Sequence, residues 1–195
     1  MGAKFISKSK LPTQWGDFAI CVFEDTETQK EHVALTFGEI DTTQAILCRI
    51  HSECLTGDAL FSLRCDCGSQ LKEAMSRISA HGSGIILYLR QEGRNIGLAN
   101  KIKAYALQDK GADTVEANQA LGFNADERSY GMCQDMFQYF GITDIELMTN
   151  NPKKIEAIQV LGLNLTNRLA IITGENTHNE SYLATKRSKL GHINE

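Results

Sequence analysis

The sequence predicts an α/β protein, with a mixed sheet flanked by helices and a β-rich N-terminal part packed onto it. Two observations predict this class. Short runs of aliphatic, aromatic and β-branched residues, separated by polar turns, fill the first third of the chain. After them, apolar residues with helical spacing alternate with strand-sized apolar runs, the order that places helices against a sheet. No linker divides the sequence, so residues 1–195 are expected to form one domain.

The first half of the chain is expected to contain several strands and one helix. Three strands fall in the runs 18–23, 32–37 and 45–50. The helix that follows has four apolar residues on one face: Leu71, Ala74, Met75 and Ile78. The His-Gly-Ser-Gly sequence at 81–84 ends this helix, and residues 85–89 are expected to form a buried strand.

Two helices are expected next. The first has its apolar face at Leu98, Ile102 and Tyr105. The second begins in the segment 122–128, because Asn124 and Glu127 have the spacing of a capping box. Its apolar face is formed by four residues, followed by Gly141 at its end: Cys133, Met136, Phe137 and Phe140.

A final strand and helix carry clear local signals. The run 145–148 is typical of a strand, and Asn151 follows as the N-cap of a helix with Pro152 in its first turn. Gly162 lies just past the end of that helix. The buried face is formed by three residues: Ile155, Ile158 and Leu161.

Length and composition disfavour several functions. The 195 residues are 42% hydrophobic and 23% charged, which is typical of a globular chain. The net charge of −4 disfavours general electrostatic binding to nucleic acid or anionic membranes. No apolar run approaches the roughly 20 residues that span a bilayer, and the N-terminus has no signal-peptide pattern. We therefore expect a cytoplasmic protein whose cysteines are reduced thiols or metal ligands.

Two of the expected strand ends are candidate phosphate sites. Residues 90–97 follow the strand at 85–89, and residues 149–154 follow the strand at 145–148; both segments open into helices. Ligands of α/β sheets bind outside the carboxyl ends of strands. Free backbone N–H groups, the positive end of a helix and cationic side chains meet at such a place, so each segment suits a phosphate group.

Cys54, Cys65 and Cys67 lie close together in the sequence and suit zinc, which prefers sulfur and nitrogen ligands. Three protein ligands leave a fourth place for water, as in a catalytic site. His51 stands three residues before Cys54, so the same spacing also permits a closed structural site. A third alternative is that these cysteines are core residues without a metal. The other three cysteines stand in apolar patterns and are expected in the core: Cys21, Cys48 and Cys133.

Other polar residues have simple structural explanations when they are considered singly. Asp126 suits the first turn of a helix, and Arg128 a surface ion pair. Tyr105 is expected to be half-buried in the core, and Thr114 to start a strand or a turn. A frayed C-terminal helix without chemistry would explain the last group: His178, His192 and the basic tail 186–189.

Six motifs nevertheless stand in a fixed order along the chain: 49–58 (RIHSECLTGD), 63–68 (LRCDCG), 90–94 (RQEGR), 104–109 (AYALQD), 113–118 (DTVEAN) and 149–154 (TNNPKK). In these motifs the chain closely resembles the GTP cyclohydrolase II family, from about Leu11 to the C-terminus. Several long motifs in one order are specific, whereas one Cys-x-Cys would be weak. Many members are fused to a dihydroxybutanone-phosphate synthase domain; this chain resembles the stand-alone form.

The resemblance implies a reaction. GTP and water give formate, pyrophosphate and 2,5-diamino-6-(5-phosphoribosylamino)pyrimidin-4(3H)-one, in the first step of riboflavin biosynthesis. The resemblance assigns a catalytic zinc to Cys54, Cys65 and Cys67. It also implies Mg²⁺ on the GTP phosphates and a homodimer.

Site residues follow from the resemblance position by position. The implied GTP contacts are Arg49, Ile50, His51, Ser52, Glu53, Gln70, Glu92, Gly93, Arg94, Thr114, Thr149 and Lys154. Asp126 matches a proton acceptor, Arg128 a nucleophile towards the α-phosphate, and Tyr105 a tyrosine needed for ring opening. A guanidinium with a pKa above about 12 is a poor nucleophile, so a phosphate clamp suits Arg128 better. The chain departs from the family pattern at three positions: Ile50, Asn95 and Ala99.

Two other functions compete with this one. A guanine-nucleotide binding protein with a structural zinc would not turn GTP over, and its mark would be His51 as the fourth ligand. A zinc-dependent nucleobase deaminase would carry His-x-Glu and Pro-Cys-x-x-Cys patterns. Neither pattern occurs in the sequence, so the deaminase ranks far below.

Overall fold

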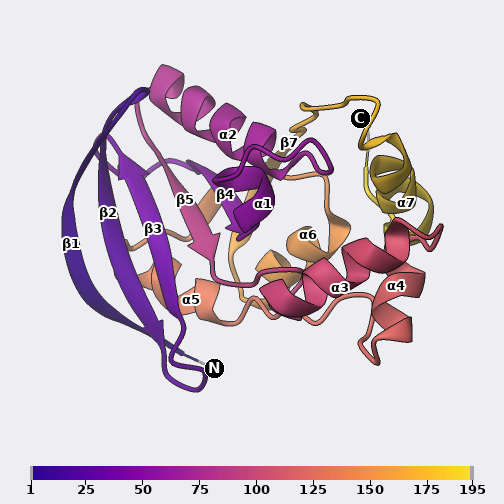
Figure 1. The fold of residues 1–195 in the computed structure, drawn as a ribbon. Helices are drawn as coiled ribbons and strands as arrows, with labels where there is room; N and C mark the ends of the chain where they lie inside the picture. The colour runs from indigo at the N-terminus through magenta and orange to yellow at the C-terminus, as the bar shows by residue number, and fades with distance from the viewer. Residues whose placement is uncertain (1, 194–195) are drawn as a thin grey trace.

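The structure, a computed structural model, describes residues 2–193, and these residues form one seven-stranded sheet (Figure 1). The strands are β1 (Ala3–Thr13), β2 (Gly16–Asp25), β3 (Glu31–Phe37), β4 (Ile46–Ser52), β5 (Gly84–Leu89), β6 (Asp144–Met148) and β7 (Asn164–Leu169). Their order in the sheet is β1-β2-β3-β5-β4-β6-β7. Three neighbouring pairs are antiparallel: β1–β2, β2–β3 and β3–β5. The other three are parallel: β5–β4, β4–β6 and β6–β7. The predicted mixed sheet with a β-rich N-terminal part is therefore confirmed.

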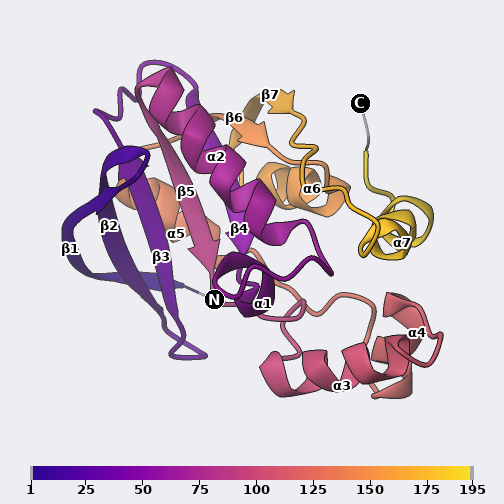
Figure 2. The same cartoon turned by 45° about the horizontal axis from the view of Figure 1, so that its top comes forward.

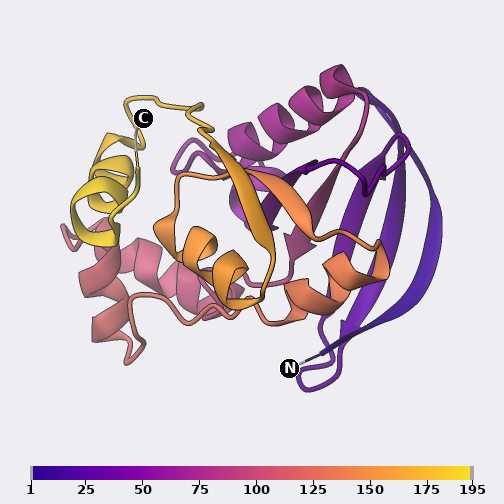
Figure 3. The same ribbon diagram turned by 180° about the vertical axis from the view of Figure 1, so that it is seen from behind.

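Helices cover both faces of this sheet, and further helices lie beyond the ends of its strands. They are α1 (Leu55–Asp58), α2 (Cys67–His81), α3 (Leu98–Gln108), α4 (Thr114–Ala120), α5 (Met132–Tyr139), α6 (Pro152–Val160) and α7 (Glu180–Leu190). Helix α2 lies on one face, and α5 and α6 lie on the other (Figures 2 and 3). Helices α3, α4 and α7 lie beyond the ends of the strands (Figure 1). Among the helices of residues 2–193, none combines the length and the apolar character that a membrane span requires.

The core has two parts, one on each face of the sheet. On β5, Ile85, Leu87 and Leu89 pack on the α5 face, whereas Ile86 packs on the α2 face. All four side chains are fully buried. A strand covered on both faces is continuously apolar, so the buried strand predicted at 85–89 is confirmed. The three cysteines predicted to be core residues are also fully buried: Cys21, Cys48 and Cys133.

The two edge strands were not predicted. Most side chains of β1 are exposed or half-buried, and β7 has no buried residue. Strand β1 is held by its antiparallel pairing to β2, and β7 by its parallel pairing to β6. Backbone hydrogen bonds do not depend on side-chain type, so such edges leave little periodicity in a sequence.

The expected helix start at 122–128 is wrong. Glu127 Oε1 accepts from Asn124 N at 2.8 Å, as in a capping box, but no helix follows until Met132. The segment is instead tied to the loop after β5, because Glu127 N donates to Arg94 O at 3.2 Å. Gln91 Nε2 also donates to Ser129 O. This pairing holds the segment extended and brings Arg128 towards the strand ends.

The apolar face predicted for α3 is also wrong, although the helix itself is confirmed. Leu98 and Ile102 are 41% and 47% exposed. The buried residues of α3 are Lys101 and Ala104. This helix lies beyond the strand ends and directs a partly polar face towards the candidate site, so the usual apolar-inside pattern fails there.

Candidate functional site

A cavity that is open to solvent lies at the carboxyl ends of β4, β5 and β6. Of the site residues predicted from the sequence, all but Ile50 and Asp126 line this cavity. Both predicted phosphate segments contribute to it, through residues 91–94 and 149–151 together with Lys154. The structure therefore brings together motifs that are more than 100 residues apart in the sequence.

Ile50 and Asp126 have supporting positions instead. The Ile50 side chain is fully buried in the core, and its backbone carbonyl accepts from Lys154 Nζ at 2.6 Å. Asp126 lies behind Arg128, accepting from Arg128 Nε at 2.8 Å and from Nη2 at 2.7 Å. The Asp126 side chain is 6% exposed. The surface ion pair expected for Arg128 is thus a buried, bidentate one.

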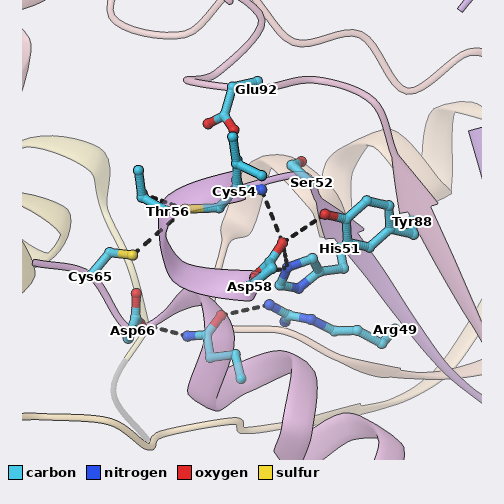
Figure 4. A network of polar contacts seen from close by, with 12 residues as sticks. Arg49, His51, Ser52, Cys54, Thr56, Asp58, Cys65, Asp66, Tyr88 and Glu92 are labelled. Atoms are coloured by element: carbon cyan, nitrogen blue, oxygen red, sulfur yellow. Dashed lines mark hydrogen bonds and ion pairs between the residues drawn. The ribbon is translucent and has the colours of Figure 1, made fainter. Parts of the chain in front are cut away.

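The thiols of Cys54, Cys65 and Cys67 converge, with all three sulfur atoms within 4.8 Å of one another. The sulfur atoms of Cys54 and Cys65 are 3.6 Å apart, and both residues are buried (Figure 4). Three thiolates at about 2.3 Å from a tetrahedral zinc lie about 3.8 Å from one another. A disulfide requires about 2.05 Å, and all three cysteines are free. The donor set and its spacing therefore fit zinc.

Two glycines allow this convergence. A Cβ atom on Gly57 would lie 2.8 Å from Cys65 Sγ, and one on Gly68 would lie 2.0 Å from the Gly57 carbonyl oxygen. Helix α1 and the start of α2 therefore touch backbone to backbone, which only glycine permits. This contact explains why glycine follows Cys54 by three positions and Cys67 by one.

His51 does not belong to the thiol cluster. Its Nε2 atom lies 3.1 Å from Asp58 Oδ1. Asp58 Oδ2 also accepts from Cys54 N at 3.0 Å and from the Tyr88 hydroxyl at 2.9 Å (Figure 4). Burial lowers the pKa of His51, so its imidazole is neutral at pH 7. His51 and Asp58 thus brace the loop that carries Cys54, and neither belongs to the group of possible ligand atoms that the three cysteines form.

Lys101 and Tyr105 complete the side of the cavity formed by the thiols. Together, Cys54, Cys65, Cys67, Lys101 and Tyr105 are called the cysteine wall. Hydrogen bonds from the other two thiols, with the charge of Lys101, lower the pKa of Cys54; the hydrogen bond to Cys54 raises the pKa of Cys65 to about 11. Half-buried Tyr105 places its hydroxyl 3.4 Å from Thr56 Oγ1, and burial raises its pKa, so it stays protonated. The half-buried position predicted for Tyr105 is confirmed, but it faces the cavity.

Four further cations line the same cavity. Arg49, Arg128, Lys154 and Lys186 are called the cationic wall. Arg49 donates to Met148 O at 2.8 Å and to Gln70 Oε1 at 2.6 Å. Lys154 is 5% exposed, and burial together with the charges of the other three cations lowers its pKa strongly. Burying a charged lysine beside a backbone carbonyl costs folding free energy unless an anion binds next to it. The cationic wall therefore suits a polyanionic ligand.

The cavity is also lined by three residues to which the sequence analysis assigned no role: Tyr182, Lys186 and His192. Lys186 Nζ lies 2.5 Å from Asp66 Oδ1, between two cluster cysteines, and 4.7 Å from the centre of the Tyr182 ring. The predicted C-terminal helix is confirmed as α7. The prediction that this helix has no part in a site is not supported, because Tyr182 and Lys186 line the cavity. The separation of Tyr182 and Lys186 by one helical turn was the available signal.

Thr114 is the first residue of α4 and is buried at the cavity. Asp113 caps this helix, with its side chain accepting from Val115 N and Glu116 N. Glu116 in turn accepts from Asp113 N at 3.0 Å, which completes a capping box. The alternative of a strand or a simple turn at Thr114 is therefore wrong.

A three-thiol cluster and several cations in one cavity are typical of a metal-dependent enzyme for an anionic substrate. Residues 4–170 match the family model described as GTP cyclohydrolase II. The chain belongs to the GTP cyclohydrolase II family and is an enzyme of that family.

Relatives named GTP cyclohydrolase-2 match nearly the whole chain. The one from Shewanella loihica is 61% identical over 193 residues, which cover 99% of this chain and 94% of the relative. The one from Teredinibacter turnerae is 60% identical, covering 99% and 97%, and the one from Azotobacter vinelandii is 59% identical, covering 99% and 93%. A solved structure titled RibBX, a two domain 3,4-dihydroxy-2-butanone 4-phosphate synthase from A. baumannii, matches 89% of this chain and 41% of its own. Its TM-score is 0.48 at 13% identity.

Proposed function

We propose that this chain hydrolyses GTP to formate, pyrophosphate and 2,5-diamino-6-(5-phosphoribosylamino)pyrimidin-4(3H)-one, the first step of riboflavin biosynthesis. The observation that carries the proposal is that the thiol cluster and the cationic wall line one cavity. Guanine ring opening needs activated water, and pyrophosphate release needs compensation of phosphate charge. One cavity with both walls serves both reactions on one substrate.

Cys54, Cys65 and Cys67 are the proposed zinc ligands. A zinc ion bound there would keep a fourth position for water and lower the pKa of that water to about 7. Tyr105 stands on the same wall with its proton retained, so its hydroxyl donates to the purine ring during ring opening. His51 is not in the group of possible ligand atoms that the three cysteines form, so the fourth position is left for water.

The cationic wall is proposed to bind the triphosphate. Arg128 acts as a clamp on the α-phosphate, because the charge and hydrogen bonds of Asp126 raise its pKa further above the ordinary value. Burial alone would raise the pKa of Asp126, but Arg128 outweighs it and holds that pKa low. Asp126 is thus a weak base while it is paired, and becomes a proton acceptor when Arg128 turns to a phosphate.

The remaining proposed GTP contacts surround these two walls. They are Ser52, Glu53, Gln70, Glu92, Gly93, Arg94, Thr114 and Thr149. Mg²⁺ is proposed to enter with the GTP phosphates, because it is usually held by substrate phosphates and retained waters. A homodimer and a cytoplasmic location complete the proposal; light scattering after gel filtration tests the first.

An assay of the purified protein with GTP and Mg²⁺ tests the proposal, with formate and pyrophosphate measured in parallel. Equal amounts of both are expected, and formate release should vanish when zinc is stripped and return when it is restored. Pyrophosphate without formate from the zinc-loaded protein would contradict the ring-opening role. Bound GTP with neither product would favour a guanine-nucleotide binding protein instead.

A further inference from the structure

Lys101 is a buried cation that neither the sequence motifs nor the resemblance identified. It is the fourth residue of α3, and its side chain is 9% exposed. Its Nζ atom lies 3.1 Å from Cys54 Sγ, 3.0 Å from Thr56 Oγ1 and 2.7 Å from Glu92 Oε1. An ammonium group has three N–H donors and no acceptor, so these contacts use all of its donors.

These contacts join three separate elements. Glu92 follows β5, and its Oε2 atom accepts from Leu55 N, the first residue of α1, at 2.6 Å. Cys54 is the N-cap of the same helix. Lys101 therefore ties α3 to the loop after β5 and, through Glu92, to the start of α1. Both oxygens of the Glu92 carboxylate are engaged within the protein, which gives Glu92 a structural task beside any contact with substrate.

The charges at this place require a cation. Zinc bound by three thiolates carries a net single negative charge, and the Glu92 carboxylate adds another. Buried charges are costly unless they are paired, and the Lys101 ammonium contacts both Cys54 and Glu92. A hydrogen bond to a metal-bound sulfur also withdraws electron density from that sulfur, so the metal becomes a stronger Lewis acid.

We propose that Lys101 is a positioning residue for the zinc centre, an inference that rests on the proposed function. Its ammonium would compensate the negative charges of the Glu92 carboxylate and of a zinc ion held by the three thiolates, and it would weaken electron donation from the Cys54 sulfur. It also fixes the face of α3 that carries Tyr105, one turn further on, against Thr56. Lys101 thereby sets metal affinity and metal electronics without touching the reacting atoms.

Four variants test this role: Lys101→Met, Lys101→Gln, Lys101→Arg and the control Lys103→Met. Lys103 is exposed on the same helix, with Asn100 Oδ1 3.3 Å from its Nζ. Zinc affinity is measured by competition with a chelator, and the cobalt-substituted proteins are compared by their sulfur-to-cobalt absorption band. Lys101→Met and Lys101→Gln should bind zinc about 10- to 100-fold more weakly, because the buried negative charges of the thiolates and Glu92 are then uncompensated. The cobalt band should lie at lower energy, because the Cys54 sulfur donates more strongly without the charged hydrogen bond. Lys101→Arg should stay close to the parent, and Lys103→Met should match it.

Zinc affinity and a cobalt band unchanged in Lys101→Gln would overturn the positioning role, since glutamine keeps hydrogen bonds but not the charge. Equal losses in Lys101→Arg and Lys101→Gln would also overturn it, because charge would then not matter. If Lys101→Met fails to fold by circular dichroism, the Gln and Arg variants still decide. A parent protein that binds neither zinc nor cobalt would instead refute the proposed function, which separates the two failures.

Discussion

The two walls of the cavity are built in different ways. The cysteine wall comes from two compact stretches, helix α3 and the segment that runs from the end of β4 through α1 to the first residue of α2. The cationic wall draws single residues from β4, from the loop before α5, from α6 and from α7. The walls also differ in charge, because one gathers thiols around a single lysine and the other gathers cations around few counterions. We infer that ring opening depends on the first wall and phosphate chemistry on the second, and variants that affect one product without the other test this division.

Cys65→Ser should have the largest effect. Loss of one thiolate opens the buried zinc site, so zinc should be lost and formate release should fall by about 10³-fold or more. The affinity for pyrophosphate, measured by calorimetry, should change little because the cationic wall is intact. Zinc content by mass spectrometry and the two product assays check this. A Cys65→Ser protein that still releases formate would remove the metal from the proposed mechanism.

Tyr105→Phe should have the second largest effect, and it should reduce the release of one product more than that of the other. Burial raises the pKa of Tyr105, so its hydroxyl is a proton donor at neutral pH, and phenylalanine keeps the ring but not the donor. Loss of one general acid reduces a rate by about 10²- to 10⁴-fold, and that loss should fall on formate release more than on pyrophosphate release. Equal losses of formate and pyrophosphate would mean that Tyr105 does not act specifically in ring opening.

The walls also differ in how far the sequence predicted them. Three cysteines in one short stretch have a spacing that by itself indicates a possible zinc site. Lys186 stands in the basic tail 186–189, and its proximity to Asp66 exists only after α7 has packed beside the strand ends. A contact of this kind leaves no local pattern. The resemblance supplied Lys154 and Arg128 but gave no sign that Arg128 is buried with Asp126.

The elements of the fold also differ in how far the sequence predicted them. The apolar runs that became β2, β3, β4 and β5 were predictable, because burial selects their side chains. Strands β1 and β7 were not, because they depend on backbone pairing at the sheet edges. Helix α3 was predicted with the wrong face, since a site residue, Lys101, occupies the buried position that an apolar residue would normally take.

Lys154→Met should weaken phosphate binding and stabilise the free protein at once. Loss of a charged hydrogen-bond donor should lower the affinity for pyrophosphate about 10- to 100-fold, by calorimetry. Burial and neighbouring cations lower the pKa of Lys154, so its charge destabilises the folded protein below that pKa. This destabilisation disappears as pH rises towards the unfolded value of about 10.4. The melting temperature of Lys154→Met should therefore exceed that of the parent at pH 7, by a margin that shrinks towards pH 10.

A melting temperature equal to or below that of the parent at pH 7 would show that Lys154 is not destabilising in the free protein. The parent should also take up protons when pyrophosphate binds, because an anion raises the pKa of a buried lysine. Calorimetry in buffers of different ionisation enthalpy measures that uptake. The uptake should fall in Lys154→Met, and an unchanged value would place the titrating group elsewhere.

Lys186→Met should have the smallest effect of the four and is the sharpest test of where the cationic wall ends. Lys186 is 12% exposed and paired with Asp66, whereas Lys189, one turn nearer the end of the same helix, is 45% exposed and pairs with Asp113. If α7 supplies a phosphate contact, Lys186→Met should raise the KM for GTP about tenfold, with kcat and zinc content retained. Lys189→Met removes the same charge from the same helix at the surface, so its KM should match that of the parent. If Lys186→Met instead loses zinc with its KM unchanged, Lys186 serves the cysteine wall through Asp66, and the cationic wall ends at Lys154.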